Sequence, residues 1–391
     1  MTETLTLSRP TFRGLLRRLR GHSRATLVAP VEEKSIEAAD VARNEPIVEK
    51  SPNTTVQSAL LVVSKGTYSL DTNHPRPTIL HDNEVIIRTK AVGLNPIDWK
   101  SVAYNFCLPS YPWVIGRELS GIVTEVGSAV SDIAIGDEVW TSTYYRDSRA
   151  GCFQEYVAVP GHTVMPIPSR VDTDEAPCLG VAGLTAAMTL WRWLNVPCPL
   201  QLQPEAHGDE EWLLIWGGST VTGQFATQLA VLSGLKVITV TSSKTERLSR
   251  SLGATHVVTR DGKTDDEIVE GIRLAVGDKI TRAIDLVGPK TAGLALRAVS
   301  SQSPVSLAPL AMIAADQEVG SNVTVHTVEM KQFVLDSSCR KYAQWLNALV
   351  GEGRIVFPEL RKIDGGLAAI VDGLDVLRQG DMSGKKLVIR L

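Results

Sequence analysis

A short stretch rich in glycine and hydroxyl groups, residues 217–222, has the residue types that bind a phosphate group. It follows an apolar run, 213–216, that is too short for a helix core and fits a buried strand, and apolar residues then recur at helical spacing to residue 232. Backbone amides at the start of such a helix lack internal partners and carry the positive end of the helix dipole, so they can hold an anion. The stretch departs from G-x-G-x-x-G at its second and third glycines, so an ordinary tight turn is the alternative. The residues expected at the phosphates are Gly217, Gly218, Ser219, Thr220, Val221 and Thr222.

The residues after the next apolar strand, 236–241, favour a nucleotide site. NAD-binding proteins usually place an acidic residue here, where it binds the ribose diol. This chain has Ser242, Ser243, Lys244 and Thr245 instead. Hydroxyls and a cation suit the 2′-phosphate of NADPH, whereas a carboxylate would repel it, so we expect NADPH as the cofactor. The alternative is that these residues only cap the next helix.

From residue 213 to residue 307, apolar strands alternate with amphipathic helices. Such alternation is typical of a parallel sheet that helices cover on both faces. The predicted fold class is therefore α/β, with a Rossmann-type parallel sheet. The expected strands are 213–216, 236–241, 256–259, 283–287 and 305–307, and the expected helices are 222–232, 243–252, 265–276 and 291–299.

The composition limits the classes of function. The chain has 391 residues, enough for two domains, and its formal net charge of −3 favours neither nucleic acid nor an anionic membrane. No apolar run approaches the roughly 18 residues of a transmembrane helix. The five cysteines are scattered and form no CxxC pair, which argues against disulfides or structural zinc and for a reducing compartment.

Residues 1–52 differ from the rest, because a run of arginines precedes an acid-rich stretch. The first part can form a basic amphipathic helix around Phe12 and Leu16, as in a mitochondrial transit peptide. A disordered extension is the alternative, and either way we exclude these residues from the fold. The expected location is the cytoplasm, with mitochondrial targeting as the alternative.

From residue 57 the chain is rich in short strands that glycine and proline separate, as in a small barrel-like antiparallel domain. The expected strands are 59–64, 84–92, 121–126 and 153–159. Two runs stand out within this part. Residues 93–100 read Gly-Leu-Asn-Pro-Ile-Asp-Trp-Lys, and residues 115–121 read Ile-Gly-Arg-Glu-Leu-Ser-Gly, with Val-Gly at 126–127 and Gly-Asp-Glu-Val at 136–139.

These motifs, followed by a nucleotide-binding half, resemble the medium-chain dehydrogenase/reductase superfamily. Its members have a GroES-like catalytic domain that a Rossmann domain interrupts. The resemblance covers residues 57–391, and Ser-Gly-Lys-Lys-Leu-Val at 383–388 matches the segment that returns to the catalytic domain. The implied parts are a GroES-like domain at 53–180, a Rossmann domain at 181–333 and a C-terminal return at 334–391.

The chain lacks the ligands of the zinc alcohol dehydrogenases. No cysteine precedes the aspartate-containing turn, Arg117 replaces the histidine of Gly-His-Glu, and the four-cysteine lobe is absent, so we expect no metal. The chain resembles the zinc-independent branch, and within it the fungal trans-acting enoyl reductases of polyketide biosynthesis, of the lovastatin-pathway type. Quinone reductases of the same branch share much of this pattern.

The resemblance implies an NADPH-dependent enoyl reductase that reduces the C=C bond of an α,β-unsaturated polyketide thioester for a partner synthase. The implied partner is the acyl-carrier-bound substrate, with no nucleic acid and no membrane. A reductase of free quinones or 2-alkenals and a non-catalytic NADPH-binding protein are the alternatives. An acidic carrier protein would need a basic rim around the channel, for which the candidates are Arg117, Arg146, Arg149 and Lys331.

The resemblance also implies roles for single residues. Lys100 is expected near the nicotinamide, where its ammonium can bind the ribose or stabilise the developing enolate, although a surface lysine is the alternative. Thr185, in a helix that opens at Gly183, is expected beside it, and Arg260 is expected against the adenine. Asp285 is expected to be structural, and residues 323–333 to lie near the substrate channel. The further implied cofactor contacts are Ile97, Asp98, Trp99, Leu307, Ala308, Ser383 and Gly384.

Overall fold

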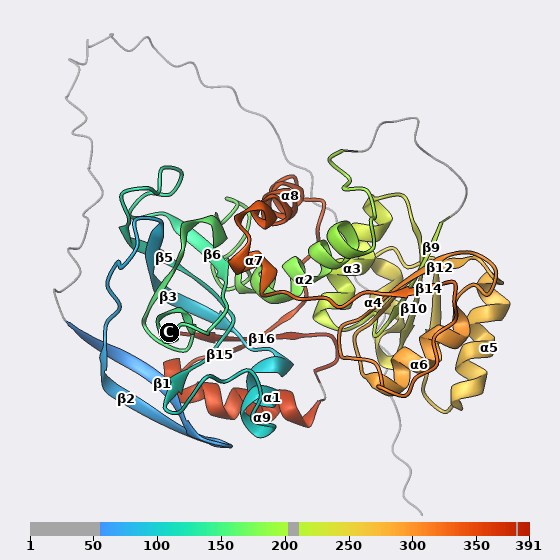
Figure 1. Cartoon of the computed structure of the whole chain (residues 1–391), viewed down its shortest axis with the longest axis horizontal. Helices are drawn as coiled ribbons and strands as arrows, with labels where there is room; N and C mark the ends of the chain where they lie inside the picture. The colour runs from blue at the N-terminus through green and yellow to red at the C-terminus, as the bar shows by residue number, and fades with distance from the viewer. Residues whose placement is uncertain (1–54, 202–210, 381) are drawn as a thin grey trace, which may run out of the picture. The chain divides into compact units, whose positions relative to one another are not determined.

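The computed structural model describes residues 55–201, 211–380 and 382–391 (Figure 1). The extension at 1–52, with its two alternative interpretations, lies outside the described residues. All of the described residues belong to one unit of the chain, Glu49–Leu391. Among them, no helix has both the length and the apolar character needed to cross a membrane.

A parallel sheet of six strands forms the nucleotide-binding half, in the order β11-β10-β9-β12-β13-β14. The order reverses at β9, which lies between β10 and β12, and α/β proteins bind ligands at the carboxyl ends of strands beside such a reversal. The prediction of a Rossmann-type sheet is confirmed, while β14, at one edge, is not predicted from the sequence. The strands are β9 (Trp212–Trp216), β10 (Lys236–Thr241), β11 (His256–Thr259), β12 (Ile280–Asp285), β13 (Val305–Pro309) and β14 (Val323–Val325).

Helices follow the strands of this sheet, as the alternating pattern predicts. Helix α5 begins with a capping box, in which Thr264 Oγ1 accepts a hydrogen bond from the Glu267 N–H and the Glu267 carboxylate accepts one from the Thr264 N–H. The apolar side of α5 packs with α6 into one core of the sheet, and α3 packs into another core. The helices are α3 (Val221–Leu232), the 3₁₀ turn η5 (Ser243–Thr245), α4 (Glu246–Ser251), α5 (Asp265–Val276) and α6 (Pro289–Ala298).

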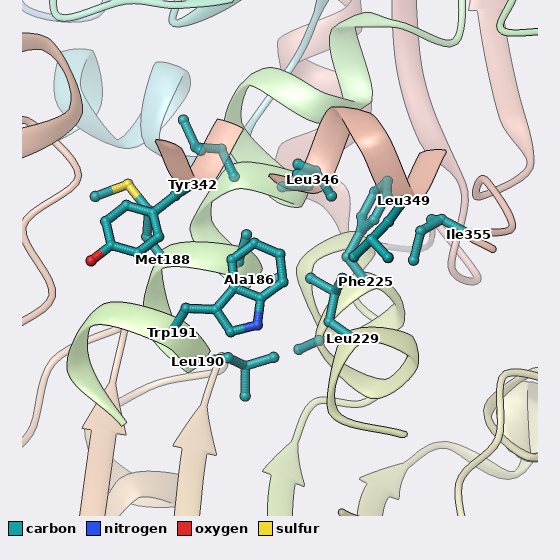
Figure 2. Close-up of a cluster of buried hydrophobic side chains, with 14 of the residues drawn as sticks. Ala186, Met188, Leu190, Trp191, Phe225, Leu229, Tyr342, Leu346, Leu349 and Ile355 are labelled. Carbon is teal, nitrogen blue, oxygen red and sulfur yellow. The ribbon is translucent and has the colours of Figure 1, made fainter. Parts of the chain in front are cut away.

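A further group of helices packs against α3 (Figure 2). Two π-helical turns, η3 (Leu179–Gly183) and η4 (Thr189–Trp193), flank α2 (Leu184–Met188) and make one helical stretch. Helix α2 begins directly after Gly183, as predicted, but the backbone is already helical in η3, so Thr185 lies inside a longer helical stretch. The apolar side chains that join α2, α3 and α8 (Arg340–Gly351) include Ala186, Met188, Phe225, Leu229, Tyr342, Leu346 and Leu349 (Figure 2).

The β-rich half contains a sheet in the order β15-β16-β3-β5-β6-β8, with β7 also paired to β3, and a second sheet in the order β2-β1-β4. Strand β16, at the end of the chain, pairs with β3, so the parallel sheet is an insertion within the β-rich domain, as predicted. The strands are β1 (Val56–Ser64), β2 (Thr67–Pro75), β3 (Glu84–Gly93), β4 (Trp113–Val114), β5 (Glu118–Val126), β6 (Glu138–Ser142), β7 (Tyr156–Pro160), β8 (Val164–Pro166), β15 (Leu360–Ile363) and β16 (Lys386–Arg390). The helices of this half and its connections are α1 (Pro96–Ala103), α7 (Gln332–Leu335) and α9 (Ile370–Gln379).

Candidate functional site

A cavity of about 490 Å³ lies where segments of the parallel sheet, of α1 and of the C-terminal strand come together. The residues that line it come from the turn after β9, the ends of β10 and β11, the start of α1 and the segment before β16. They include Asn95, Pro96, Ala182, Ser219, Thr220, Val221, Thr222, Ser242, Lys244, Thr245, Arg260, Asp261, Met382, Ser383, Gly384, Lys385 and Lys386.

The turn after β9 is shaped so that the start of α3 is open to this cavity. Gly217 has a φ of +94°, and a Cβ on Gly218 would lie 2.6 Å from the Thr239 side chain, so both positions favour glycine. The hydroxyl of Thr220 caps α3, because it accepts a hydrogen bond from the Gly223 N–H at 3.0 Å. The first residues of α3 line the cavity, so its amide groups and dipole can hold a phosphate there.

Hydroxyl groups connect this turn to the end of β10. Thr241 donates a hydrogen bond to the Ser219 hydroxyl at 2.7 Å and shares another with Thr245 at 2.6 Å. The Ser242 and Thr245 hydroxyls lie 3.1 Å apart. Ser242, Thr245 and Lys244 all line the cavity, whereas the backbone N–H of Ser243 donates to a carboxylate.

The carboxylate that Ser243 bonds belongs to Asp261, which the sequence reasoning did not single out. Asp261 and Arg260 follow β11, and both are exposed and line the cavity. The Arg260 N–H donates to the Thr241 carbonyl at 2.9 Å, which fixes this turn beside the end of β10. The cavity wall therefore contains a carboxylate next to Lys244 and Arg260.

The segment before β16 closes the cavity from the C-terminal side. Gln224 of α3 donates hydrogen bonds to the Gly384 carbonyl at 2.6 Å and to the Ser219 carbonyl at 3.0 Å. Gly384 has a φ of +84°, and a Cβ there would lie 2.8 Å from the Leu248 side chain. One amide side chain thus holds the C-terminal segment against the turn after β9, and Ser383 and Gly384 line the cavity.

A buried ionic group lies at the wall of the cavity beneath this segment. Lys386 forms an ion pair with Glu118 and donates to the Asn95 Oδ1 atom at 2.8 Å. Asn95 in turn donates to Glu118 at 2.8 Å, and the second Glu118 oxygen accepts from the Val181 N–H. Lys386 is 3% exposed and Glu118 is fully buried, so this group joins β16, β5, α1 and η3 without solvent.

Helix α1 carries Lys100 and three other predicted cofactor contacts. The Asp98 carboxylate is fully buried and accepts a hydrogen bond from the Asn95 N–H at 2.8 Å, which caps the helix. Burial raises the pKa of Asp98 to about 7, although Arg117 opposes this effect. The prediction that Asp98 contacts the cofactor is therefore corrected, because its side chain is directed to its own helix start. Trp99 is likewise packed against the apolar core of this domain.

Lys100 and Ile97 are half-buried. Neither lines the cavity, although Asn95 and Pro96 at the start of α1 do. The Lys100 ammonium lies 5.7 Å from the centre of the Trp99 ring. The other predicted catalytic residue, Thr185, is 8% exposed and lies three positions after Ala182, which does line the cavity. Lys100 and Thr185 thus follow, by about one helical turn, residues that form the cavity wall.

Two predicted contacts, Leu307 and Ala308, do not line the cavity. Leu307 and Ala308 lie in β13, an inner strand, where successive side chains point to opposite faces of the sheet. Leu307 packs into the core with α5 and α6, and Ala308 packs into the core with α3. Both side chains are fully buried in these cores.

The expected basic rim is also corrected in part. The Arg117 guanidinium lies 4.6 Å from the centre of the Tyr145 ring and donates to the Tyr145 hydroxyl, so it packs inward. Arg149 forms ion pairs with Glu84 and Asp147, so its charge is already paired within the chain. Of the four candidates, Arg146 is exposed, and Lys331 is half-buried and pairs with Glu329 at 2.8 Å.

The remaining predictions concern the loops and metal ligands. The Asp285 carboxylate accepts hydrogen bonds from the Val287 and Gly288 N–H groups and so holds the turn before α6. Of residues 323–333, the first three form β14 at the sheet edge, and no member of the segment lines the cavity. In the described part of the chain, no three histidine, cysteine or acidic side chains gather as a metal site would require.

The comparisons with known proteins agree with this architecture. Residues 81–169 match the family described as alcohol dehydrogenase GroES-like domain, and residues 222–350 match the family described as zinc-binding dehydrogenase. Among solved structures, the CurK enoyl reductase superposes with a TM-score of 0.71 at 19% identity, over 85% of this chain and 99% of that one. A quinone oxidoreductase of Pseudomonas syringae pv. tomato superposes with a TM-score of 0.70 at 20% identity, over 86% and 100%. At these identities, the structures show the fold alone.

Curated relatives are more similar in sequence. The trans-enoyl reductase buaC of Petromyces alliaceus is 31% identical over 353 residues, which span 85% of this chain and 96% of the relative. The enoyl reductase component lovC of the lovastatin nonaketide synthase, from Aspergillus terreus, is 28% identical over 86% of this chain and 96% of the relative. The chain is therefore an oxidoreductase of the medium-chain dehydrogenase/reductase superfamily and belongs with the fungal trans-enoyl reductases.

Proposed function

We propose that this protein is an NADPH-dependent enoyl reductase that reduces the C=C bond of an α,β-unsaturated polyketide thioester carried by a partner synthase. The observation that carries the proposal is the cavity that joins the phosphate-binding turn to the start of α1 and to the buried Lys386 group. A dinucleotide and a reacting carbonyl compound need adjacent sites of this kind. The names of the relatives, trans-enoyl reductases, support the choice of substrate class.

The cavity fits an extended dinucleotide by its chemistry. The open start of α3 supplies amide donors for the two central phosphates, and the glycines at 217 and 218 let the backbone approach them. Lys244, Ser242 and Arg260 supply a cation, a hydroxyl and a guanidinium at the ends of β10 and β11, where a 2′-phosphate would bind. When bound, NADPH would supply a hydride to the β-carbon of the enoyl group.

The residues of this chain would stabilise the charge that reduction creates. As the β-carbon receives hydride, negative charge grows on the thioester oxygen, and a fixed cation or hydroxyl lowers the barrier. We assign this role to the Lys100 ammonium, which α1 holds in place through its Asn95 and Asp98 caps. The Thr185 hydroxyl would orient the carboxamide or the substrate from the opposite helical stretch.

The test compares two substrates with the full chain at one NADPH concentration. An enoyl thioester on an acyl carrier protein or on pantetheine is one substrate, and a free quinone is the other, with NADPH oxidation followed by its absorbance. We expect the thioester to turn over faster, and mass spectrometry should find the saturated acyl chain. Faster reduction of the quinone would favour the stand-alone quinone or alkenal reductase. Binding of NADPH without turnover of either substrate would favour the non-catalytic alternative.

A further inference from the structure

An acidic residue, Asp261, stands among the basic and hydroxyl groups that we assign to the 2′-phosphate. Strands β10 and β11 pair Thr241 with Thr259, so the residues that follow the two strands are neighbours. Asp261 is exposed, lines the cavity and accepts a hydrogen bond from the Ser243 N–H. The protein thus places a carboxylate of its own among the residues that we assign to the 2′-phosphate.

A carboxylate and a phosphate compete for the same donors and repel one another. The hydrogen bonds from Ser243 hold the pKa of Asp261 below its usual range, with a smaller contribution from the charge of Arg260, so Asp261 is ionised at neutral pH. A 2′-phosphate must therefore displace this carboxylate or bind beside it. A 2′-hydroxyl would instead meet a hydrogen-bond acceptor.

We propose that Asp261 is a specificity-determining residue that weakens the preference of this site for NADPH over NADH. The inference rests on the proposed function, because it takes the cavity to be the dinucleotide site. Lys244 and Arg260 favour the phosphate, and Asp261 opposes them. The net preference is then smaller than that of the same site without the carboxylate.

The test measures binding, and its probes are 2′,5′-ADP and 5′-AMP, which differ by the 2′-phosphate alone. The substitution Asp261→Asn keeps an acceptor for the Ser243 N–H and removes the charge. By calorimetry on the full chain, we expect the affinity for 2′,5′-ADP to rise about three- to tenfold, as for one exposed charge contact, and that for 5′-AMP to stay within about twofold. Added salt should reduce the gain, because it screens the repulsion.

Asp278→Asn is the matched control. Asp278 also accepts a backbone hydrogen bond, from Ser301 at 2.8 Å, but it precedes β12 and so lies at the amino ends of the parallel strands, whereas the cavity lies at their carboxyl ends. Replacing Asp278 should change the affinity for neither 2′,5′-ADP nor 5′-AMP. Lys244→Gln should weaken 2′,5′-ADP alone, which places the 2′-phosphate at this end of the cavity.

The outcomes separate this inference from the proposed function. If the ratio of the two affinities is unchanged in Asp261→Asn, the proposed role of Asp261 is wrong. If that variant still binds both probes, the assignment of the cavity as the dinucleotide site is retained. If the unmodified protein binds neither probe, both the inference and the proposed function fail. A selective gain for 2′,5′-ADP supports both.

Discussion

At the scale of single residues, Asp98 and Lys100 lie two positions apart on α1 but have different surroundings. Asp98 is fully buried and holds the helix start, whereas Lys100 is half-buried with its ammonium beside the Trp99 ring. A buried capping carboxylate serves stability, and a fixed cation near a reacting group can serve chemistry. The two positions therefore give two distinct predictions.

The substitution Lys100→Ala should slow turnover while leaving the fold intact. One fixed electrostatic contact to a developing oxyanion is worth about 10²–10³ in rate, so we expect a fall in kcat of that size on an enoyl thioester. A half-buried lysine contributes little to core packing, so the free energy of unfolding should change by less than about 1 kcal/mol. Steady-state kinetics and urea unfolding measure the two effects.

Lys65→Ala is the control for this prediction, because Lys65 is exposed in the turn between β1 and β2. Its kcat should equal that of the unmodified protein. If Lys100→Ala also keeps full turnover, Lys100 is an ordinary surface lysine.

The substitution Asp98→Asn should change how stability depends on pH. The folded-state pKa of Asp98 is about 7, whereas an unfolded aspartate has a pKa of about 3.9. Between these values the unfolded chain loses the proton that the folded protein keeps, so the contribution of Asp98 to stability falls as pH rises. The free energy of unfolding of the variant, relative to the unmodified protein, should therefore rise from pH 4 to pH 7 by up to about 4 kcal/mol.

Asp174→Asn provides the contrasting curve in the same urea titrations. Although burial raises its pKa, hydrogen bonds from Arg390 and Lys362 hold the pKa of Asp174 below its usual value. Both states then keep this carboxylate ionised above about pH 5, so the effect of the variant should be constant up to pH 7. A similarly flat difference for Asp98→Asn would mean that its pKa is not raised.

At the scale of elements, the sequence predicts a helix or strand well where the signals for it lie within or beside that element. Strands β10 and β11 and helix α5 have the bounds expected from the sequence, because apolar periodicity, a capping threonine and closing glycines all lie within or beside them. Strand β14 has three residues with half-exposed or exposed side chains, so no apolar run predicts it. Strand β14 forms because it pairs with β13, and no pattern in the sequence indicates that pairing.

The candidate site was predictable where a short motif or the resemblance to a family names its residues. The phosphate turn and the residues after β10 are contiguous, and ten of the predicted cofactor contacts line the cavity: Ser219, Thr220, Val221, Thr222, Ser242, Lys244, Thr245, Arg260, Ser383 and Gly384. The Lys386–Glu118 pair spans 268 positions of the chain, and Asp261 follows Ser243 by 18. The motifs contained Glu118 and Lys386, but spacing alone does not show that their side chains meet.

The C-terminal strand should depend on that buried pair. Replacing Lys386 by Met leaves Glu118 charged and buried without its cation, which typically costs about 3–5 kcal/mol of unfolding free energy. Lys385→Met is the matched control, because its partner Glu359 is exposed and such pairs contribute about 1 kcal/mol or less. Adding Glu118→Gln to Lys386→Met should restore part of the lost stability. Equal effects of the two lysines in urea unfolding would contradict a strong buried pair.

At the scale of the whole molecule, the proposed function requires that a substrate attached to a carrier protein reach the cavity. The formal net charge of −3 gives no global attraction for an acidic carrier, so any attraction must be local. Arg146 and Lys331 remain as rim candidates. They come from distant parts of the chain, one after β6 and one before α7.

If this pair guides a carrier protein, its effect should appear in KM and should depend on salt. Arg146→Glu combined with Lys331→Glu should raise KM for a carrier-bound enoyl thioester at low salt and leave kcat nearly unchanged, because rim charges act on encounter. Salt above about 0.1 M should reduce the difference between variant and unmodified protein. The same thioester on pantetheine lacks the acidic surface, so its KM should respond to neither change.

Lys290→Glu is the control, since Lys290 is another exposed lysine paired with a carboxylate, Asp265, on the outer helices of the parallel sheet. An equal rise in KM for the pantetheine substrate would assign these cations to the substrate channel itself and remove the carrier from the explanation.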